Sequence, residues 1–131
     1  MLGTLKPPSV KKKTAQPLWE HVDEIQSRIR EAGRVLLLLD FDGTLAPISN
    51  DPAAVRLPLP VHQLLTALAE SERVVPAILS GRSLVDVRTR VGIPGLIYAG
   101  NHGLEIEGPG LQFVEPLHEA RPRVRGGDKT G

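Results

Sequence analysis

The chain has 131 residues, which allows one domain and little more. Its formal net charge of +1 gives no reason to expect a nucleic acid or a membrane surface as a partner. The chain has no cysteine, which excludes disulfides and thiolate metal sites, and we therefore expect a cytoplasmic protein. Nothing in the sequence predicts an oligomeric state.

Residues 1–17 are predicted to be a disordered basic leader. They contain four lysines, no acidic residue and no apolar stretch of the kind that a secretory signal requires. Without these four charges the rest of the chain has a formal net charge of −3, so the basic character is confined to the leader. A nucleic-acid-binding arm is the alternative, although a solvated tail is the usual role of such a tract.

Apolar residues with helical spacing follow at Leu18, Val22, Ile25 and Ile29. They predict an amphipathic helix that ends near Gly33 and packs against the core. A helix that binds in the groove of a partner is the alternative.

The central stretch of the chain is VLLLLDFDGTL, residues 35–45. Its apolar run predicts a strand of a parallel sheet that is buried on both faces, and the run is far too short to span a bilayer. Reactive groups in such sheets lie just beyond the carboxyl ends of the strands, where Asp40 is located. Asp42 can reach the same volume because Gly43 allows the backbone to turn sharply.

Two carboxylates this close repel one another, and a divalent cation relieves the repulsion. Carboxylate oxygens suit Mg²⁺, so we expect Asp40 and Asp42 to be metal ligands. One carboxylate can attack phosphorus while the other transfers protons. A strand that ends in a solvated acidic turn is the alternative. The apolar run before the two acids and the Gly-Thr-Leu after them favour the catalytic interpretation.

The elements after residue 45 predict an α/β fold. They are a loop over 46–59, a helix with Pro60 in its first turn, a strand over 73–79, a helix from a Ser83 cap to about Val91, a strand over 96–99, and a hairpin of 104–107 with 111–114. Strands that alternate with helices favour right-handed β-α-β units. Pro76 cannot donate to a sheet ladder, so the second strand is expected at an edge or with a bulge.

A second part of the site is predicted at Ser80, Gly81 and Arg82, which follow the second strand and precede a helix. A hydroxyl, main-chain amides and a helix N-terminus together can bind phosphate, and Arg82 can add a charged contact. A helix cap beside a surface arginine is the alternative.

The third part follows the next strand, where Asn101 and His102 lie between glycines and Glu105 follows on the hairpin. Their donors and acceptors suit the hydroxyls of a sugar, so we interpret these residues as substrate-binding. A histidine that serves only the backbone of the turn is the alternative.

The segment DFDGTL after an apolar strand resembles motif I of the haloacid-dehalogenase superfamily of phosphatases. Together, LLLLDFDGTLAPI, ILSGRS and YAGNHGLEIEGPG resemble the trehalose-6-phosphate phosphatases over about residues 35–116. The resemblance implies an α/β, parallel three-layer Rossmannoid core and hydrolysis of trehalose 6-phosphate in trehalose biosynthesis. It implies that Asp40 forms an aspartyl-phosphate, that Asp42 transfers protons and that Ser80 holds the phosphate. Magnesium would bind the Asp40 carboxylate and the main-chain carbonyl of Asp42.

The family pattern also includes a lysine motif, a GDD motif and a cap domain, none of which is recognisable in this sequence. The segment GGDKTG at 126–131 lacks the second acid and a preceding strand. We therefore expect a partial core over 18–116 without the cap, an unstructured tail over 117–131, and a truncated chain with little activity of its own. A non-catalytic fragment that binds a sugar phosphate or a protein is the alternative.

Overall fold

The computed structural model describes residues 14–116 of a chain that divides into two units, Met1–Ala32 and Gly33–Gly131. The described part of the first unit is a 3-10 helix, Leu18–His21, that continues into helix α1, Val22–Glu31. The predicted helix is therefore confirmed, and it ends two residues before Gly33. Among residues 14–116, no helix is long and apolar enough to cross a membrane.

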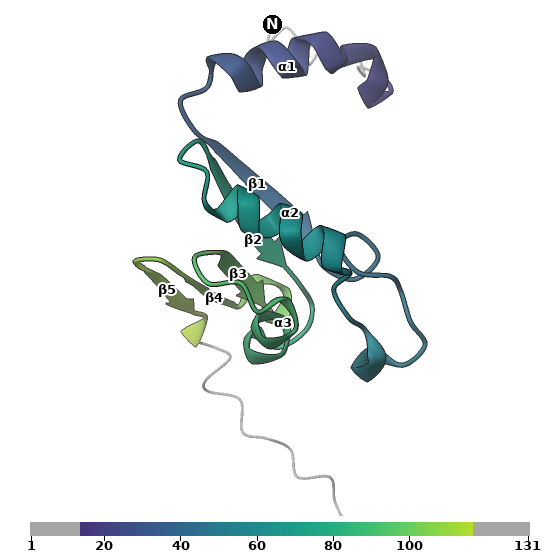
Figure 1. The fold of residues 1–131 in the computed structure, drawn as a ribbon, viewed down its shortest axis with the longest axis vertical. Helices are drawn as coiled ribbons and strands as arrows, with labels where there is room; N and C mark the ends of the chain where they lie inside the picture. Colours follow the sequence, from purple (N-terminus) through teal and green to yellow (C-terminus); the bar gives the residue numbers. More distant parts are fainter. Residues whose placement is uncertain (1–13, 117–131) are drawn as a thin grey trace, which may run out of the picture. The chain divides into compact units, whose positions relative to one another are not determined.

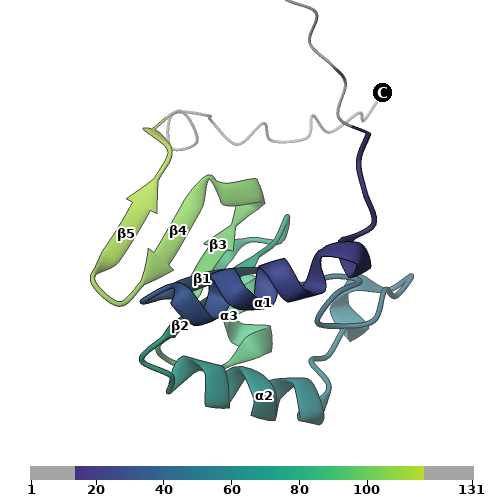
Figure 2. The same cartoon turned by 90° about the horizontal axis from the view of Figure 1, so that it is seen from above.

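The second unit contains a five-stranded mixed sheet (Figure 1). The strands are neighbours in sequence order: β1, Val35–Asp40; β2, Val74–Leu79; β3, Ile97–Gly100; β4, Glu105–Gly108; and β5, Leu111–Val114. The first three strands are parallel, and β4 and β5 add an antiparallel hairpin, which Figure 2 shows beside β3. The predicted α/β class and hairpin are confirmed.

Helices α2, Leu59–Ala69, and α3, Leu84–Val91, connect the parallel strands. As predicted, Pro60 lies in the first turn of α2 and the Ser83 hydroxyl caps α3, accepting a hydrogen bond from the amide of Asp86 at 3.1 Å. Gly92, with φ of 65°, ends α3 in the left-handed conformation that glycine adopts at little cost.

The core lies between the sheet and these two helices. Leu39, Ile78 and Tyr98 form one row across β1, β2 and β3, because Leu39 pairs with Ile78 and Ile78 with Tyr98. The row packs in one cluster with apolar side chains of both helices. The largest fully buried side chains are Phe41, Leu65, Ile78, Val87 and Val91. Since right-handed crossovers through a 1-2-3 strand order put both helices on one face, this face of the sheet is the buried one.

The other face of β1 differs from the prediction. Leu36 and Leu38 are 60% and 56% exposed, so this strand is not buried on both faces among the described residues. The physical reason is the topology, because α2 and α3 cover the face that carries Leu39. An apolar run alone does not indicate which of its two faces the following helices cover.

Pro76 is also placed differently. It lies in β2, which pairs with both β1 and β3 in unbroken register, so the expectation of an edge strand or a bulge is wrong. In β2 the main-chain N–H and C=O groups of odd-numbered residues point toward β1, and those of even-numbered residues point toward β3. The Ser80 amide, just after β2, accordingly donates to the Ala99 carbonyl of β3 at 2.9 Å. The nitrogen of Pro76 therefore faces β3, but pairing with β3 begins only at Ala77, so the missing N–H is not needed there.

Residues 1–13 and 117–131 lie outside the described part of the chain. The lysines predicted to form a basic leader and the GGDKTG segment fall in these ranges.

Candidate active site

Three strand ends meet at one edge of the sheet. Asp40 is the last residue of β1 and pairs with Leu79, which in turn pairs with Ala99 of β3. Ser80 follows β2 directly, and Gly100 ends β3. The three predicted parts of the site are therefore adjacent in the fold, since carboxyl ends of parallel strands share an edge.

A tight loop after β1 places Asp42. Phe41 is fully buried, and its amide donates to the Leu79 carbonyl at 3.1 Å. The Phe41 carbonyl accepts from the amides of Leu45 and Ala46 at 3.1 and 3.0 Å, and Gly43 adopts a φ of 80°. The buried phenyl ring anchors the loop, which leaves the Asp42 side chain 41% exposed at the edge.

Arg82 binds Asp42 with two nitrogen atoms. Its Nε donates to Asp42 Oδ2 at 2.9 Å, and its Nη2 donates to Oδ1 at 2.8 Å. The guanidinium also lies 5.7 Å from the centre of the Phe41 ring, a cation–π distance. The hydrogen bonds from Arg82 hold the pKa of Asp42 below its ordinary value, against the opposing effect of burial. Asp42 is thus a carboxylate at neutral pH.

The turn after β2 is tied to the turn after β3. The Asn101 amide donates to the Arg82 carbonyl at 2.6 Å, and the His102 amide donates to the Ser80 carbonyl at 3.0 Å. The His102 ring lies over Gly81, where an added Cβ would be 2.5 Å from His102 Cε1. A Cβ at residue 81 would therefore force the His102 ring to move away from this turn. Ser80 itself is buried, and its hydroxyl accepts from the Arg82 amide at 3.0 Å.

Asn101 and His102 both have left-handed backbone angles, with φ of 49° and 58°. Such angles are uncommon outside glycine and occur mostly for residues such as these, at a modest cost in energy. The Asn101 side-chain amide donates to Glu105 Oε2 on β4, so these two predicted substrate-binding residues bind one another.

Two neighbouring cavities lie along this edge. The first, about 310 Å³, is lined by Asp40, Ser80, Gly81 and His102, with Leu79 and Gly103. The second, about 410 Å³, contains Asp42 and Arg82 together with the same glycine and histidine and with Ile48, Ser49 and Pro52. The two aspartates thus line adjoining cavities that share a Gly81–His102 wall.

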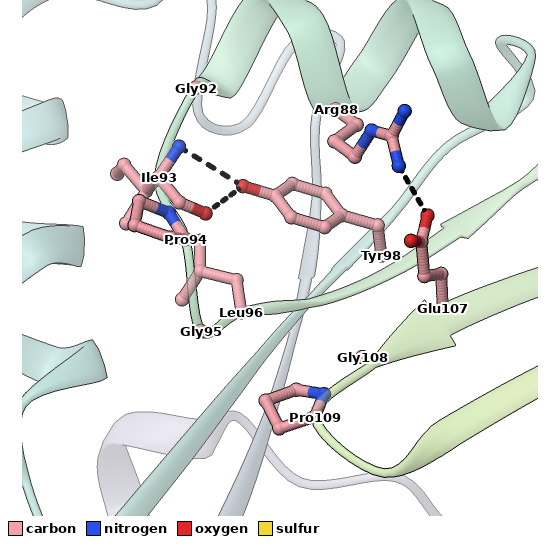
Figure 3. A pocket seen from close by; sticks show the side chains of 10 residues that line it. All are labelled: Arg88, Gly92, Ile93, Pro94, Gly95, Leu96, Tyr98, Glu107, Gly108 and Pro109. Carbon is pink, nitrogen blue, oxygen red and sulfur yellow. Dashed lines mark hydrogen bonds and ion pairs between the residues drawn. The ribbon is translucent and has the colours of Figure 1, made fainter.

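A third cavity, of about 480 Å³, contains none of the predicted site residues (Figure 3). It lies at the opposite edge, beside the start of β3 and the β4–β5 turn. Its polar groups are already paired, because the Tyr98 hydroxyl donates to the Ile93 carbonyl at 2.6 Å and Arg88 binds Glu107 at 2.7 Å. Nothing in its lining connects it to the chemistry of the first two cavities.

The prediction from sequence missed two charged residues behind Arg82. Asp86 accepts from Arg82 Nη1 at 3.0 Å and from Arg90 Nε at 2.8 Å. A signal was present for the second pair, since Asp86 and Arg90 are spaced four apart on α3, the spacing at which side chains on a helix meet.

The oxygen donors of the site fit magnesium in part. Mg²⁺ is usually bound by one or two carboxylates, with water and substrate oxygens completing the shell. Asp40 supplies a carboxylate that lines the first cavity, whereas both oxygens of the Asp42 carboxylate accept hydrogen bonds from Arg82. Within residues 14–116 there is no group of three or more His, Cys, Asp or Glu side chains that could hold a metal.

Comparison with known proteins agrees with this geometry. A family model described as trehalose-phosphatase matches residues 38–122. Over 73 residues the chain is 49% identical to the trehalose-phosphate phosphatase of Mycobacterium avium (strain 104), which covers 56% of this chain and 18% of that protein. Over 98 residues it is 40% identical to the Mycobacterium ulcerans (strain Agy99) protein of the same name, covering 68% and 24%.

Solved structures give the same result. Trehalose-6-phosphate phosphatase of Aspergillus fumigatus, crystal form 3, aligns with a TM-score of 0.63 at 33% identity, over 76% of this chain and 37% of that one. The C-terminal domain of the C. albicans enzyme aligns with a TM-score of 0.61 at 28% identity, over 68% and 31%.

The parallel strands, the acidic carboxyl end of β1 and these structural likenesses define a haloacid-dehalogenase-like α/β phosphatase fold. Within that class, the family-model match extends over more than half of the sequence. The chain belongs to the trehalose-phosphatase family. It spans less than a quarter of the length of each of the two mycobacterial relatives.

Proposed function

We propose that the protein hydrolyses trehalose 6-phosphate to trehalose and phosphate. The observation that carries this proposal is the 310 Å³ cavity, where Asp40 at the end of β1 faces the Ser80–Gly81 turn within a trehalose-phosphatase sequence. A nucleophile, hydrogen-bond donors and an open edge are what transfer of a phosphoryl group requires.

Asp40 is the proposed nucleophile. One of its carboxylate oxygens attacks phosphorus, and the bond between phosphorus and the sugar oxygen breaks, which leaves an aspartyl-phosphate. Water then attacks phosphorus, releases phosphate and restores the Asp40 carboxylate. The exposed position of Asp40 at the end of β1 supports this role, because the carboxylate is open to a ligand.

Asp42 is proposed to protonate the leaving sugar oxygen and then to take a proton from the attacking water. Arg82 holds the pKa of Asp42 low, so the carboxylate is ionised before substrate arrives. The role as an acid therefore requires its pKa to rise when the phosphate dianion binds. A nearby negative charge has this effect, and phosphate also competes with Asp42 for the guanidinium of Arg82.

The remaining residues are assigned to binding. Ser80, Gly81 and Arg82 would hold the phosphate. Ser80 lines the first cavity, Arg82 lines the second and Gly81 lines both, which supports this assignment. Asn101, His102 and Glu105 would bind the sugar. Of these, His102 lines both cavities, whereas Asn101 and Glu105 are bound to each other and would act as a pair.

Magnesium is the proposed cofactor, held by the Asp40 and Asp42 side of the edge. When bound, it would neutralise negative charge on the phosphoryl group. The donor chemistry supports one or two protein carboxylates, with substrate oxygens as further ligands. The cytoplasm is the proposed location, since a chain without cysteine suits a reducing compartment; recovery of the native protein in a secreted fraction would contradict it.

The test uses a chimera in which residues 1–116 continue into the remainder of the Mycobacterium avium relative. We expect Mg²⁺-dependent release of phosphate from trehalose 6-phosphate, at least about tenfold faster than from glucose 6-phosphate or sucrose 6-phosphate. Excess chelator should abolish the release, and added Mg²⁺ should restore it. Equal rates on the three substrates, or full activity with excess chelator, would contradict the proposal.

Binding of a sugar phosphate without turnover is the second candidate. The observation in its favour is that Arg82 is already engaged by Asp42, Asp86 and the Pro52 carbonyl. Calorimetry of the chimera with trehalose 6-phosphate and Mg²⁺, beside a phosphate assay, distinguishes the two. Binding to the chimera without release of phosphate favours this candidate, and release of phosphate by the chimera rejects it.

A further inference from the structure

Three side chains form a charged row at the start of α3 and along it. Asp86 and Arg90 lie four residues apart on one side of α3, and Arg82 lies two residues before the helix begins. The Asp86 carboxylate binds a different arginine with each oxygen: Oδ2 accepts from Arg82 at 3.0 Å, and Oδ1 accepts from Arg90 at 2.8 Å. Arg82, the first residue of the row, also binds Asp42 through two nitrogens.

The same arginines bind the loop that follows β1. Arg90 Nη1 donates to the carbonyls of Val55 and Ala53 at 2.8 and 3.2 Å. Arg82 Nη1 donates to the Pro52 carbonyl at 3.0 Å. The loop carries the short 3-10 helix Pro52–Ala54, and Pro52 lines the cavity that contains Asp42. The row therefore fixes α3 and one wall of that cavity to each other.

Burial separates this row from ordinary surface ion pairs. The side chains of Arg82 and Arg90 are only 12% and 16% exposed, whereas Asp86 is 36% exposed. Exposed single pairs contribute little, because solvent screens them and long side chains lose freedom in forming them. A guanidinium that is mostly buried and bound at several atoms has a fixed orientation, and this orientation is passed on to the carboxylate that it binds.

We propose that Asp86 and Arg90 are positioning residues that hold the Arg82 guanidinium in the orientation that fixes the Asp42 carboxylate. The inference rests on the proposed function for the role of Asp42, but the arrangement of the row does not depend on turnover. Neither residue touches the cavity of Asp40, so both act through Arg82. Preorganised support of this kind is what keeps a proton-transferring group in place.

The test measures the Nε–Hε signal of Arg82 by ¹⁵N NMR in the 131-residue chain. This N–H binds Asp42 and not Asp86, so faster exchange of its proton with solvent on replacement of Asp86 reports a weakened contact with Asp42. The signal is identified by its loss in Arg82→Lys. In Asp86→Asn we expect it to shift and to exchange with solvent roughly tenfold faster. The cap hydrogen bond survives this change, because it uses the main-chain amide of residue 86.

Three further variants complete the test. Arg90→Gln should move the Arg82 signal in the same direction by a smaller amount, and Asp86→Glu should restore part of the wild-type signal. Glu107→Gln is the matched control, because it removes the partner of Arg88 on the same helix at the opposite edge (Figure 3) and should leave the signal unchanged. An unchanged signal in both Asp86→Asn and Arg90→Gln, or an equal change in Glu107→Gln, would overturn the proposal. The result does not depend on catalysis, so a chimera without turnover would refute the proposed function and leave this inference standing.

Discussion

The ion pair between Asp42 and Arg82 makes the stability of the fold depend on pH. The hydrogen bonds from Arg82 lower the pKa of Asp42, so the folded protein binds this proton less readily than the unfolded chain does. The pair therefore stabilises the fold above the unfolded pKa of about 3.9, and this contribution is lost as the pH falls through the folded value.

Asp42→Asn should accordingly lower the free energy of unfolding by about 1 kcal/mol near neutral pH, a small value because Asp42 is 41% exposed. The difference from wild type should shrink below about pH 4, where the wild-type carboxyl gains its proton. Urea unfolding across this range, with chelator present, measures it. A difference that stays constant at low pH would show that the charge of Asp42 is not its cause.

Asp40 is the residue on which the proposed catalysis depends. In the chimera, Asp40→Asn should reduce turnover of trehalose 6-phosphate by roughly a thousandfold or more, because an amide cannot act as the nucleophile. The urea midpoint should change little, since the swap is nearly isosteric and the side chain is exposed. Asp51→Asn is the control, because residue 51 caps the nearby 3-10 helix outside the cavities and asparagine can also cap. Near-normal turnover in Asp40→Asn would show that Asp40 is not the nucleophile.

The packing of α3 against β3 is the contact between elements that brings the second and third parts of the site together. A Cβ added at Gly100 would overlap the Leu84 amide nitrogen and the Leu84 Cα in the first turn of α3. These are backbone atoms, so the overlap cannot be relieved by a rotation of a side chain. Glycine at the end of β3 thus allows the helix to begin where it does.

Gly100→Ala should therefore destabilise the fold by about 1–3 kcal/mol, the usual cost of overpacking. Gly33→Ala is the matched control, since nothing lies within 4 Å of its added Cβ. Urea unfolding of both variants makes the comparison. Equal stability of the two would show that α3 can move away from β3 at little cost.

Sequence patterns predicted the elements well where local chemistry determines them. Ser83 and Gly92 bound α3 as expected, and Pro60 lies in the first turn of α2, because caps and first-turn prolines act over a few residues. Pro76 was misplaced because its effect depends on where β3 begins, which is a property of the partner strand. The covered face of β1 depends likewise on the course of the connecting helices.

The sequence predicted which residues lie at the strand ends that form the candidate site, but it did not predict the contacts between their side chains. Asp40, Ser80 and His102 were placed together because the carboxyl ends of parallel strands share an edge. The bidentate contact between Arg82 and Asp42 joins positions forty residues apart, and no local pattern indicates it. That contact makes Arg82 a partner of the proposed acid–base carboxylate as well as a candidate phosphate ligand.

At the scale of the whole molecule, Tyr98 reports on the integrity of the core. It is the only tyrosine of the chain, it is 3% exposed, and its hydroxyl binds both the amide and the carbonyl of Ile93. Burial raises the pKa of Tyr98 above its ordinary value, because the phenolate would lack solvent. The protonated Tyr98 side chain therefore stabilises the fold below the unfolded pKa of about 10, and this contribution is lost as the pH rises through the folded value.

Absorbance of the phenolate should consequently show no titration near pH 10 while the fold persists. Ionisation should begin at higher pH and coincide with the loss of circular dichroism. The same titration in concentrated urea gives the ordinary value for comparison. A reversible titration near pH 10 with unchanged circular dichroism would mean that the β3 core is open to solvent.

In the proposed function, Asp40 accepts the phosphoryl group of trehalose 6-phosphate. The most direct measurement is to quench the chimera with acid during turnover, to reduce acyl phosphates with borohydride, and to locate the modified residue by mass spectrometry. Reduction converts a phosphorylated aspartate to homoserine, so we expect homoserine at position 40 and unmodified aspartate at position 42. Turnover with modification at Asp42, or with no modified residue at all, would contradict the account.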